Sequence, residues 1–194
     1  VECSNDNLVQ FALMGDIFAQ CVLGIKNPKI GLLNVGSEDI KGNSIVKQAH
    51  ENLKRIEKQI NFYGFVEGDD INKGIVDVVV TDGFSGNIAL KTAEGVADLI
   101  FTYLKNAYQS SFISKLGYIL SKPALNRFKT RIDPRKYNGA VLLGLNGIIV
   151  KSHGGTDAFG FSNAISVAIS LIKNNYVNTI EKKLTGKHEW YFQK

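Results

Sequence analysis

Apolar residues recur along this chain at helical spacing in some stretches and as short, β-branched runs in others. The helical spacing predicts helices over residues 5–23, 45–56, 85–108, 157–175 and 177–184. The short apolar runs predict strands over residues 30–35, 60–66, 76–80, 140–145 and 148–151. Because strands alternate with helices, we expect an α/β sandwich built on a largely parallel sheet.

Turn and cap residues mark the boundaries of these elements. Ser4 or Asn5 is expected to cap the first helix and Gly24 to end it. Pro123 is expected to end or bend the helical pattern around it. Residues 109–136 are interpreted as a helical excursion within one unit over residues 1–184, and residues 185–194 as a peripheral tail.

The positive charge of the chain is concentrated in one segment. The net charge is +5, with 23 basic and 18 acidic residues. Residues 111–136 hold seven basic residues against Asp133 alone, a net charge of +6, so the remainder carries −1. We therefore expect a local acidic partner and no nucleic acid, since binding to nucleic acid would favour a more widely spread charge.

The composition is that of an ordinary globular protein, with 44% hydrophobic and 21% charged residues. Cys3 and Cys21 match neither a disulfide framework nor a zinc pattern, which favours a reducing cytosol. No apolar run is long enough to span a membrane, and no secretion signal is evident. The chain starts at Val1 without an initiator methionine, so we expect a fragment or a chain that lacks its front part.

A first glycine-rich turn separates the 76–80 strand from the long helix. Its polar and glycine residues are Asp82, Gly83, Ser85, Gly86 and Asn87. Backbone N–H groups at such a strand-to-helix turn favour anions, so this turn is a candidate phosphate site. The alternative is a capped turn of no special function, with Ser85 as the N-cap.

A second turn of this kind follows the 148–151 strand and precedes a helix. Its candidate residues are Asn146, Lys151, His153, Gly154, Gly155, Thr156 and Asp157. Lys151 supplies charge, and His153 can donate or exchange a proton near neutral pH. The alternative is a structural loop in which Thr156 or Asp157 caps the helix.

Asn34 and Gly36 form a third, weaker candidate after the 30–35 strand. Three turns after three strands would converge on one edge of the sheet. We assign no function to His50 or His188, and with no Cys or His cluster we expect no metal site.

The basic segment interleaves cations with apolar residues. The residues expected to contact a partner are Phe112, Lys115, Leu116, Ile119, Leu120, Lys122, Arg127, Lys129 and Arg131. An amphipathic basic helical pair suits an anionic membrane surface or an acidic protein. It could equally pack its apolar side on the body of the protein or on a twin subunit.

Several stretches in order resemble the PlsX family of acyl-carrier-protein:phosphate acyltransferases. They are Ile30–Glu38 with Lys41–Asn43, Phe65–Ile71, Asp77–Asn87, Lys91–Gly95, Tyr137–Ala140, Gly144–Gly147 and Lys151–Gly154. The resemblance covers residues 1 to about 172. The family's N-terminal third, with its Asp-Ala-Met-Gly-Gly-Asp turn, has no counterpart here, and the ending after Asn174 is left unmatched to the family.

The resemblance implies transfer of a fatty acyl group from acyl carrier protein to inorganic phosphate, giving acyl phosphate for phospholipid synthesis. It also implies a three-layer fold like that of phosphotransacetylases and isocitrate or isopropylmalate dehydrogenases. The protein would be a cytoplasmic homodimer that touches the inner leaflet and uses no metal, nicotinamide or other cofactor. His153, Asp157 and Asn87 are the expected catalytic residues, with His153 handling a proton or the oxyanion and Asp157 orienting His153 or its loop.

Two other classes stay open. One is a phosphotransacetylase-like enzyme of the same fold, and the other is a non-catalytic fragment that binds lipid or carrier. A decarboxylating dehydrogenase is disfavoured because the chain lacks the Asp-x-x-x-Asp spacing of its metal ligands.

Overall fold

The computed structural model of the protein describes residues 3–185. Its strands are β1 (Lys29–Leu33), β2 (Asn61–Val66), β3 (Val78–Val80), β4 (Ala140–Val141) and β5 (Val150–Lys151). Its α-helices are α1 (Asn5–Phe18), α2 (Ser44–Arg55), α3 (Asp70–Lys73), α4 (Gly83–Gln109), α5 (Phe112–Arg131), α6 (Ala158–Lys173) and α7 (Tyr176–Thr185). A π-helical turn (Ala19–Leu23) continues α1, and a 3₁₀ turn, η2 (Pro134–Tyr137), follows α5.

The main sheet has three parallel strands in the order β2-β1-β3. Its central strand, β1, is buried at Ile30, Gly31 and Leu32, as the continuous apolar run predicts for a parallel strand covered on both faces. The parallel sheet and the α/β class are therefore confirmed. Parallel pairing also places the carboxyl ends of all three strands at one edge of the sheet, where a site of this fold class is expected.

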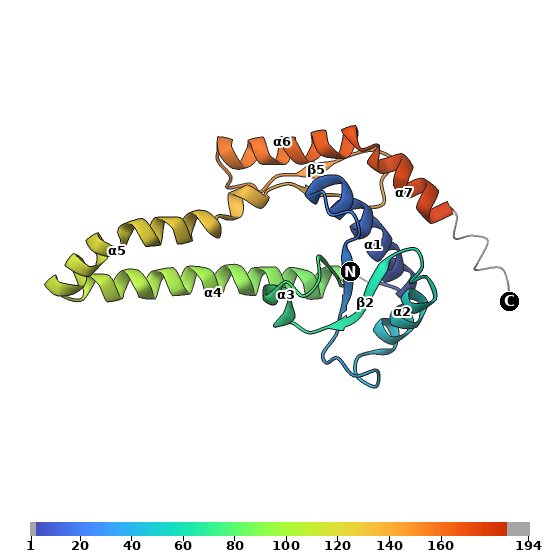
Figure 1. Ribbon diagram of the computed structural model, residues 1–194, viewed down its shortest axis with the longest axis horizontal. Coiled ribbons are helices and arrows are strands. Elements are labelled where there is room, and N and C mark those ends of the chain that lie inside the picture. The colour runs from blue at the N-terminus through green and yellow to red at the C-terminus, as the bar shows by residue number, and fades with distance from the viewer. Residues whose placement is uncertain (1–2, 186–194) are drawn as a thin grey trace.

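Helix α1 packs against β1, β3, α2 and α7 (Figure 1). Its approach to β3 is so close that a Cβ atom at Gly15 would lie 2.8 Å from Cγ1 of Val78. The helix begins with a capping box between Ser4 and Asn7. The π-helical turn ends at Gly24, which has a left-handed φ of 70°. Both predicted boundaries of this helix are confirmed.

A second core cluster joins the end of α1 to α6 and α7. Ile17, Leu171 and Tyr176 are buried there, and Phe18 packs edge-on against Tyr176 with ring centroids 6.5 Å apart. Asp16 and Lys183 form an ion pair that ties α1 to α7 beside this cluster. The predicted helices over 157–175 and 177–184 are confirmed as α6 and α7.

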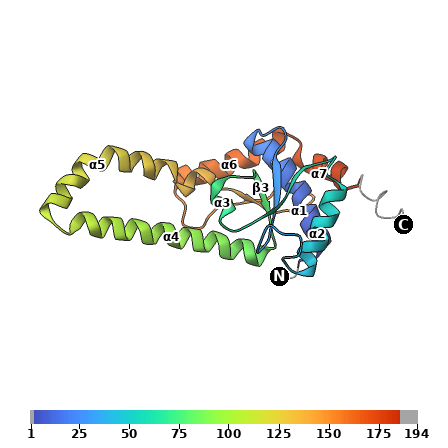
Figure 2. The same cartoon turned by 60° about the horizontal axis from the view of Figure 1, so that its bottom comes forward.

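Helices α4 and α5 form a long hairpin that projects from the rest of the molecule (Figures 1 and 2). The helical pair expected within residues 109–136 is instead one helix, α5, paired with α4. Pro123 was expected to end or bend its helix; α5 continues through it to Arg131, and the α5 ribbon bends between the hairpin tip and the body (Figures 1 and 2). A helix can tolerate the missing N–H of a proline when neighbouring turns are intact, at a cost in stability.

The predicted strands over 140–145 and 148–151 are shorter than expected. β4 and β5 pair antiparallel over two residues each, and the bond from the Leu142 N–H to the Ile149 carbonyl extends the pairing by one step. Within residues 3–185, no helix has the length and apolar character needed to cross a bilayer. Of the predicted tail, Thr185 ends α7, and residues 186–194 lie outside the described part of the chain.

Candidate functional site

Two of the three glycine-rich turns meet at the carboxyl edge of the main sheet. The turn after β1 begins at Asn34, and the turn after β3 leads to Asp82 at the start of α4. β1 and β3 are neighbours, so these turns lie side by side. The turn after β2 joins them, since Oε1 of Glu67 accepts a hydrogen bond of 3.2 Å from the Ser37 N–H.

Asn34 closes the first of these turns from within. It is buried, and its Nδ2 donates to the carbonyls of Gly36 at 3.0 Å and Lys41 at 3.1 Å. Gly42 allows this closure because its φ is 94° and its Cα lies against the Asn34 amide. Both N–H groups of the Asn34 side chain are thus engaged in holding the turn, and the buried Gly36 is part of the same closure.

Asp82, and not Ser85, is the N-cap of α4, which begins at Gly83. Its Oδ1 accepts hydrogen bonds of 2.9 Å from the N–H groups of Phe84 and Ser85. The pKa of Asp82 is lowered by its hydrogen bonds with Ser85, and then with Phe84. Two of the N–H groups that would attract an anion here are therefore already bound to a carboxylate. Asn87 lies on the first turn of α4 with its residue exposed.

The loop between β5 and α6 is held by Asn138. The Asn138 Nδ2 donates to Oγ of Ser152 at 2.8 Å and to the Gly160 carbonyl at 2.9 Å. Its Oδ1 accepts a hydrogen bond of 2.9 Å from the His153 N–H. One amide therefore fixes both ends of the segment that carries His153, Gly154 and Gly155.

His153 is exposed, and its ring also helps shape the loop. Nδ1 accepts a hydrogen bond of 3.3 Å from the Gly155 N–H. Nε2 has no hydrogen-bond partner among residues 3–185, so this nitrogen is available to exchange a proton with a substrate. The pKa of Glu94 on α4 is lowered by the hydrogen bond and charge of Lys91, with His153 as the smallest cause.

Asp157 is held by Arg135 and by the start of α6. Its Oδ1 accepts a hydrogen bond of 3.0 Å from the Gly160 N–H, and its Oδ2 lies 2.7 Å from Nη1 of Arg135. The pKa of Asp157 is lowered first by the Gly160 N–H and then by Arg135. Arg135 also pairs with Asp133 at 2.6 Å, and this contact lowers the pKa of Asp133 to about 2. Asp157 thus anchors the loop through the helix, since it makes no hydrogen bond or ion pair with His153 in the described chain.

Arg135 and Asn138 hold the site but were not among the residues predicted for it. Asn138 belongs to the Tyr137–Ala140 motif and precedes Gly139. The φ of 120° at Gly139 and its close approach to Ala164 require a glycine. That Asn-Gly pair was the available signal. Arg135 carried no signal beyond membership of the basic segment.

The expectation that three turns converge on one sheet edge is wrong for the turn at 151–157. The Lys151–Asp157 loop follows β5, which belongs to the separate two-stranded sheet. α6 begins beside η2, near the end of α5, whereas α4 begins at the main sheet (Figures 1 and 2). Across residues 3–185, no hydrogen bond or ion pair links the turn at 82–87 to the loop at 151–157.

Lys151 differs from the cations at the edge of the main sheet in having no carboxylate partner within the described chain. At that edge, Lys41 pairs with Glu38 at 2.8 Å and Lys73 with Asp69 at 2.6 Å. Lys151 and its neighbour His153 are both exposed. Thr156 packs against Gly160 at the start of α6, and Asn146 lies exposed in the β4–β5 loop. The loop at 151–157 therefore offers an anion more free positive charge than the turn at 82–87.

The apolar members of the basic segment are exposed on α5. Phe112, Ile113 and Leu120, which are 76%, 80% and 83% exposed, lie on the half of α5 that adjoins the hairpin tip. The cations expected to contact a partner, Lys115, Lys122, Arg127, Lys129 and Arg131, lie on the same helix.

Comparison with known proteins gives a consistent result. The family described as fatty acid synthesis protein matches residues 1–179. A phosphate acyltransferase from Paramagnetospirillum magneticum is 59% identical over 183 residues, which are 94% of this chain and 52% of that protein. Phosphate acyltransferases from Rhodospirillum rubrum and Rhodospirillum centenum are 53% and 55% identical, over 94% and 95% of this chain and 52% of each relative. The chain spans about half the length of these relatives. It belongs to the fatty acid synthesis protein family, which is the PlsX family that its motifs resemble.

Proposed function

We propose that the protein containing this chain transfers a fatty acyl group from acyl carrier protein to inorganic phosphate and so makes acyl phosphate for phospholipid synthesis. The observation that carries this proposal is the family match over residues 1–179, together with relatives named phosphate acyltransferase at 53–59% identity. Since the chain spans about half of each relative, the activity is proposed for the whole protein.

The reaction needs no covalent enzyme intermediate. An oxygen of hydrogen phosphate attacks the thioester carbonyl, and a C–O bond forms as the carbonyl oxygen becomes an oxyanion. The C–S bond then breaks, and the carrier thiol receives the proton that phosphate gives up. The site must therefore bind an anion, stabilise an oxyanion and pass one proton.

Residues of the 151–157 loop fit these tasks by type and position. Lys151 supplies an unpaired positive charge, and the Gly154 backbone adds an N–H group for phosphate. Nε2 of His153 can carry the proton from phosphate to the leaving sulfur or donate to the oxyanion. Asp157 and Asn138 position the loop through the contacts described above.

Asn87, Ser85 and the glycines of the α4 turn are proposed as a second set of substrate contacts. They lie at the carboxyl edge of the main sheet, where ligands of α/β proteins bind. The Asp82 carboxylate already accepts hydrogen bonds from two N–H groups of this turn. We therefore propose that the turn contacts either phosphate or the carrier or acyl part of the substrate. A three-layer fold like that of phosphotransacetylases remains a prediction for the whole protein.

We further propose a homodimer that works in the cytoplasm and touches the inner leaflet through α5. The exposed Phe112 and Leu120, beside cations of the same helix, support contact with anionic lipid. Acyl carrier protein is acidic, so it is the second partner that this charge would suit.

The proposal is tested by mixing purified full-length protein with acyl carrier protein thioester and phosphate, and detecting acyl phosphate by ³¹P NMR. Acyl phosphate should form only when phosphate is present. A phosphotransacetylase-like enzyme would act on acyl coenzyme A and not on the carrier thioester, and a non-catalytic protein would give no product. Either result would overturn the proposal.

A further inference from the structure

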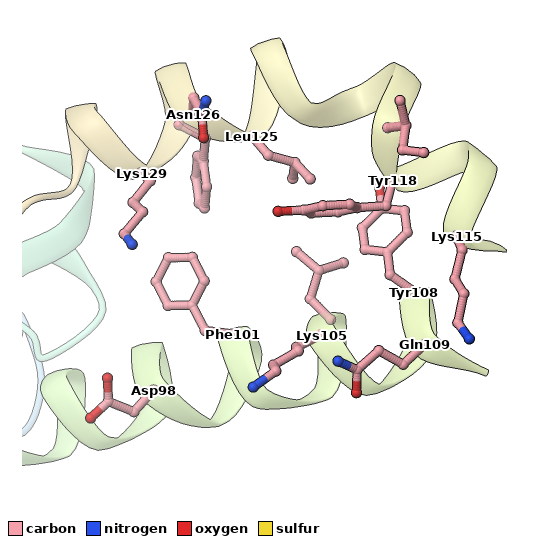
Figure 3. A pocket seen from close by; sticks show the side chains of 13 residues that line it. Asp98, Phe101, Lys105, Tyr108, Gln109, Lys115, Tyr118, Leu125, Asn126 and Lys129 are labelled. Atoms are coloured by element: carbon pink, nitrogen blue, oxygen red, sulfur yellow. The ribbon is translucent and has the colours of Figure 1, made fainter. Parts of the chain in front are cut away.

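The two helices of the α4–α5 hairpin flank an open cavity of about 820 Å³ (Figure 3). This volume lies within the range of about 300–1,000 Å³ that is typical of small-molecule sites. Neither helix has a fully buried side chain, so the two helices flank the space instead of closing it by packing. The cavity is thus a feature of the hairpin itself, separate from the glycine-rich turns.

The walls of the cavity are apolar and partly aromatic. Phe101, Leu104 and Tyr108 line it from one face of α4, at the spacing of three and four residues that aligns side chains on a helix. Two aromatic pairs cross between the helices: Phe101 with Phe128, at 6.1 Å between ring centroids, and Tyr108 with Tyr118, at 5.4 Å. Seven residues of helix, about 10 Å, separate these two crossings. An elongated apolar group fits such a space.

The lining carries more positive than negative charge. Lys105, Lys115 and Lys129 line the cavity with a single carboxylate, Asp98. None of the three lysines has a carboxylate partner within residues 3–185. In Figure 3, Lys129 extends from α5 into the space between the helices near Phe101, and Lys115 lies at the opposite end, beyond Tyr108. An anionic group would therefore find an unpaired ammonium at either end of the apolar walls.

We propose that this cavity binds a single-chain anionic amphiphile, with the chain against Phe101, Leu104 and Leu125 and the anionic head at Lys129. The choice of ligand rests on the proposed function, because acyl transfer to phosphate yields one long chain that ends in a phosphate. A fatty acid anion shares this chemistry. The cavity lies between the body and the hairpin tip, so a chain held there is on a path toward the exposed apolar residues of α5 (Figures 1 and 3).

Dodecyl phosphate, used below its critical micelle concentration, is a stable probe for this site. Isothermal titration of the purified full-length protein should show one saturable site per chain. Butyl phosphate should bind at least about a hundredfold more weakly, because most of the buried methylene groups are absent. Dodecyltrimethylammonium, of equal chain length and opposite charge, should bind at least about tenfold more weakly. Sodium dodecanoate tests whether a fatty acid anion binds as well as an alkyl phosphate does. Competition between dodecanoate and dodecyl phosphate would support a shared site.

Variants locate the site. Leu125→Trp should fill the cavity and abolish binding of dodecyl phosphate, whereas Ile172→Trp, at an exposed apolar position on α6, should not. Lys129→Gln should weaken binding about tenfold, and Lys173→Gln, on α6 and outside the lining, should leave it unchanged. Lys129 is exposed, so Lys129→Gln provides a test even if Leu125→Trp fails to fold, which circular dichroism would reveal.

Four results would overturn the inference. Dodecyl phosphate could show no saturable binding, or bind equally well in both cavity variants. Leu125→Trp could instead convert a dimer to a monomer in sedimentation, which would make the cavity an interface between two copies. Vesicles of anionic phospholipid could lose binding in Leu125→Trp while dodecyl phosphate does not, which would make it a membrane contact. Binding is read without turnover, so failure of acyl transfer leaves this test intact.

Discussion

The side-chain oxygen of Asn138 accepts a 2.9 Å hydrogen bond from the backbone N–H of His153, across fifteen residues of chain. The same amide donates to Ser152 and to the Gly160 carbonyl. The position of His153 is therefore set from outside its own loop, by the segment between η2 and β4. These three hydrogen bonds preorganise the loop at 151–157.

His153→Gln should lower kcat by about 10²–10⁴-fold if His153 handles the proton or the oxyanion. Asn138→Ala should also lower kcat, with little change in KM for the carrier thioester, because the loop loses three hydrogen bonds while its side chains remain. Steady-state assays across pH test both variants, and His153→Gln should remove one limb of the parent's pH profile. Activity of His153→Gln within a few-fold of the parent would reduce His153 to a loop-forming residue.

Lys151→Ala should raise KM for phosphate about tenfold, since it removes an unpaired cation from the proposed phosphate site. Asn87→Ala should have a smaller effect on KM for phosphate, because the α4 turn is already capped by Asp82. Lys173→Ala, at the other end of α6, is the matched control and should leave phosphate kinetics unchanged. Identical phosphate kinetics in Lys151→Ala and the parent would place phosphate elsewhere.

His50 should make the protein less stable in mild acid. It is buried, its ring stacks on Phe65 with centroids 4.0 Å apart, and Phe62 contacts it edge-on. Burial lowers the pKa of His50, and Lys54 adds to the effect, while Asp39 and Glu51 oppose it. Below pH of about 6.5 the unfolded chain takes up a proton that the folded chain excludes, so the free energy of unfolding falls until the pH reaches the folded pKa.

Urea unfolding of the parent and of His50→Phe at several pH values tests this prediction. The variant keeps an aromatic ring among Phe62 and Phe65 but cannot titrate. The difference in unfolding free energy between pH 7.5 and pH 5.5 should therefore be smaller in the variant than in the parent. An equal pH dependence in both proteins would show that other groups control acid stability.

Replacing Phe112 and Leu120 by Gln should strongly reduce binding to vesicles that contain anionic phospholipid, because both side chains are more than three-quarters exposed on α5. Turnover of the soluble carrier thioester should remain near that of the parent. Ile172→Gln, an exposed apolar position on α6, is the control in vesicle flotation. If turnover collapses while vesicle binding persists, α5 is the dock for acyl carrier protein.

Hydrophobic periodicity and helix-cap residues predicted an element of the fold correctly where a single one of these signals decides it. The parallel sheet follows from apolar runs between helices, and the first helix follows from Ser4 and Gly24. At the start of α4 two good N-cap residues compete, and Asp82 prevails over Ser85 because its carboxylate reaches two N–H groups at once. Sequence alone does not rank two such caps.

The arrangement of the site was harder to predict because it depends on contacts between distant segments. β4 and β5 are two residues each, and their pairing places Lys151 in a second sheet, so the rule for parallel strands did not apply to its loop. Arg135 reaches Asp157 across twenty-two residues, a contact that no periodic pattern reports. The cavity likewise depends on α5 folding back along α4, which hydrophobic spacing does not reveal.

The central claim, acyl transfer from carrier to phosphate, is tested most directly by supplying phosphate with all four oxygens labelled with ¹⁸O. Full-length protein and acyl carrier protein thioester should yield acyl phosphate that retains every label, including the oxygen bonded to the acyl carbon, as read by ³¹P NMR and mass spectrometry. Release of free carrier should match the acyl phosphate formed. Free fatty acid with no labelled acyl phosphate, or an unlabelled bridging oxygen, would contradict attack by phosphate on the thioester.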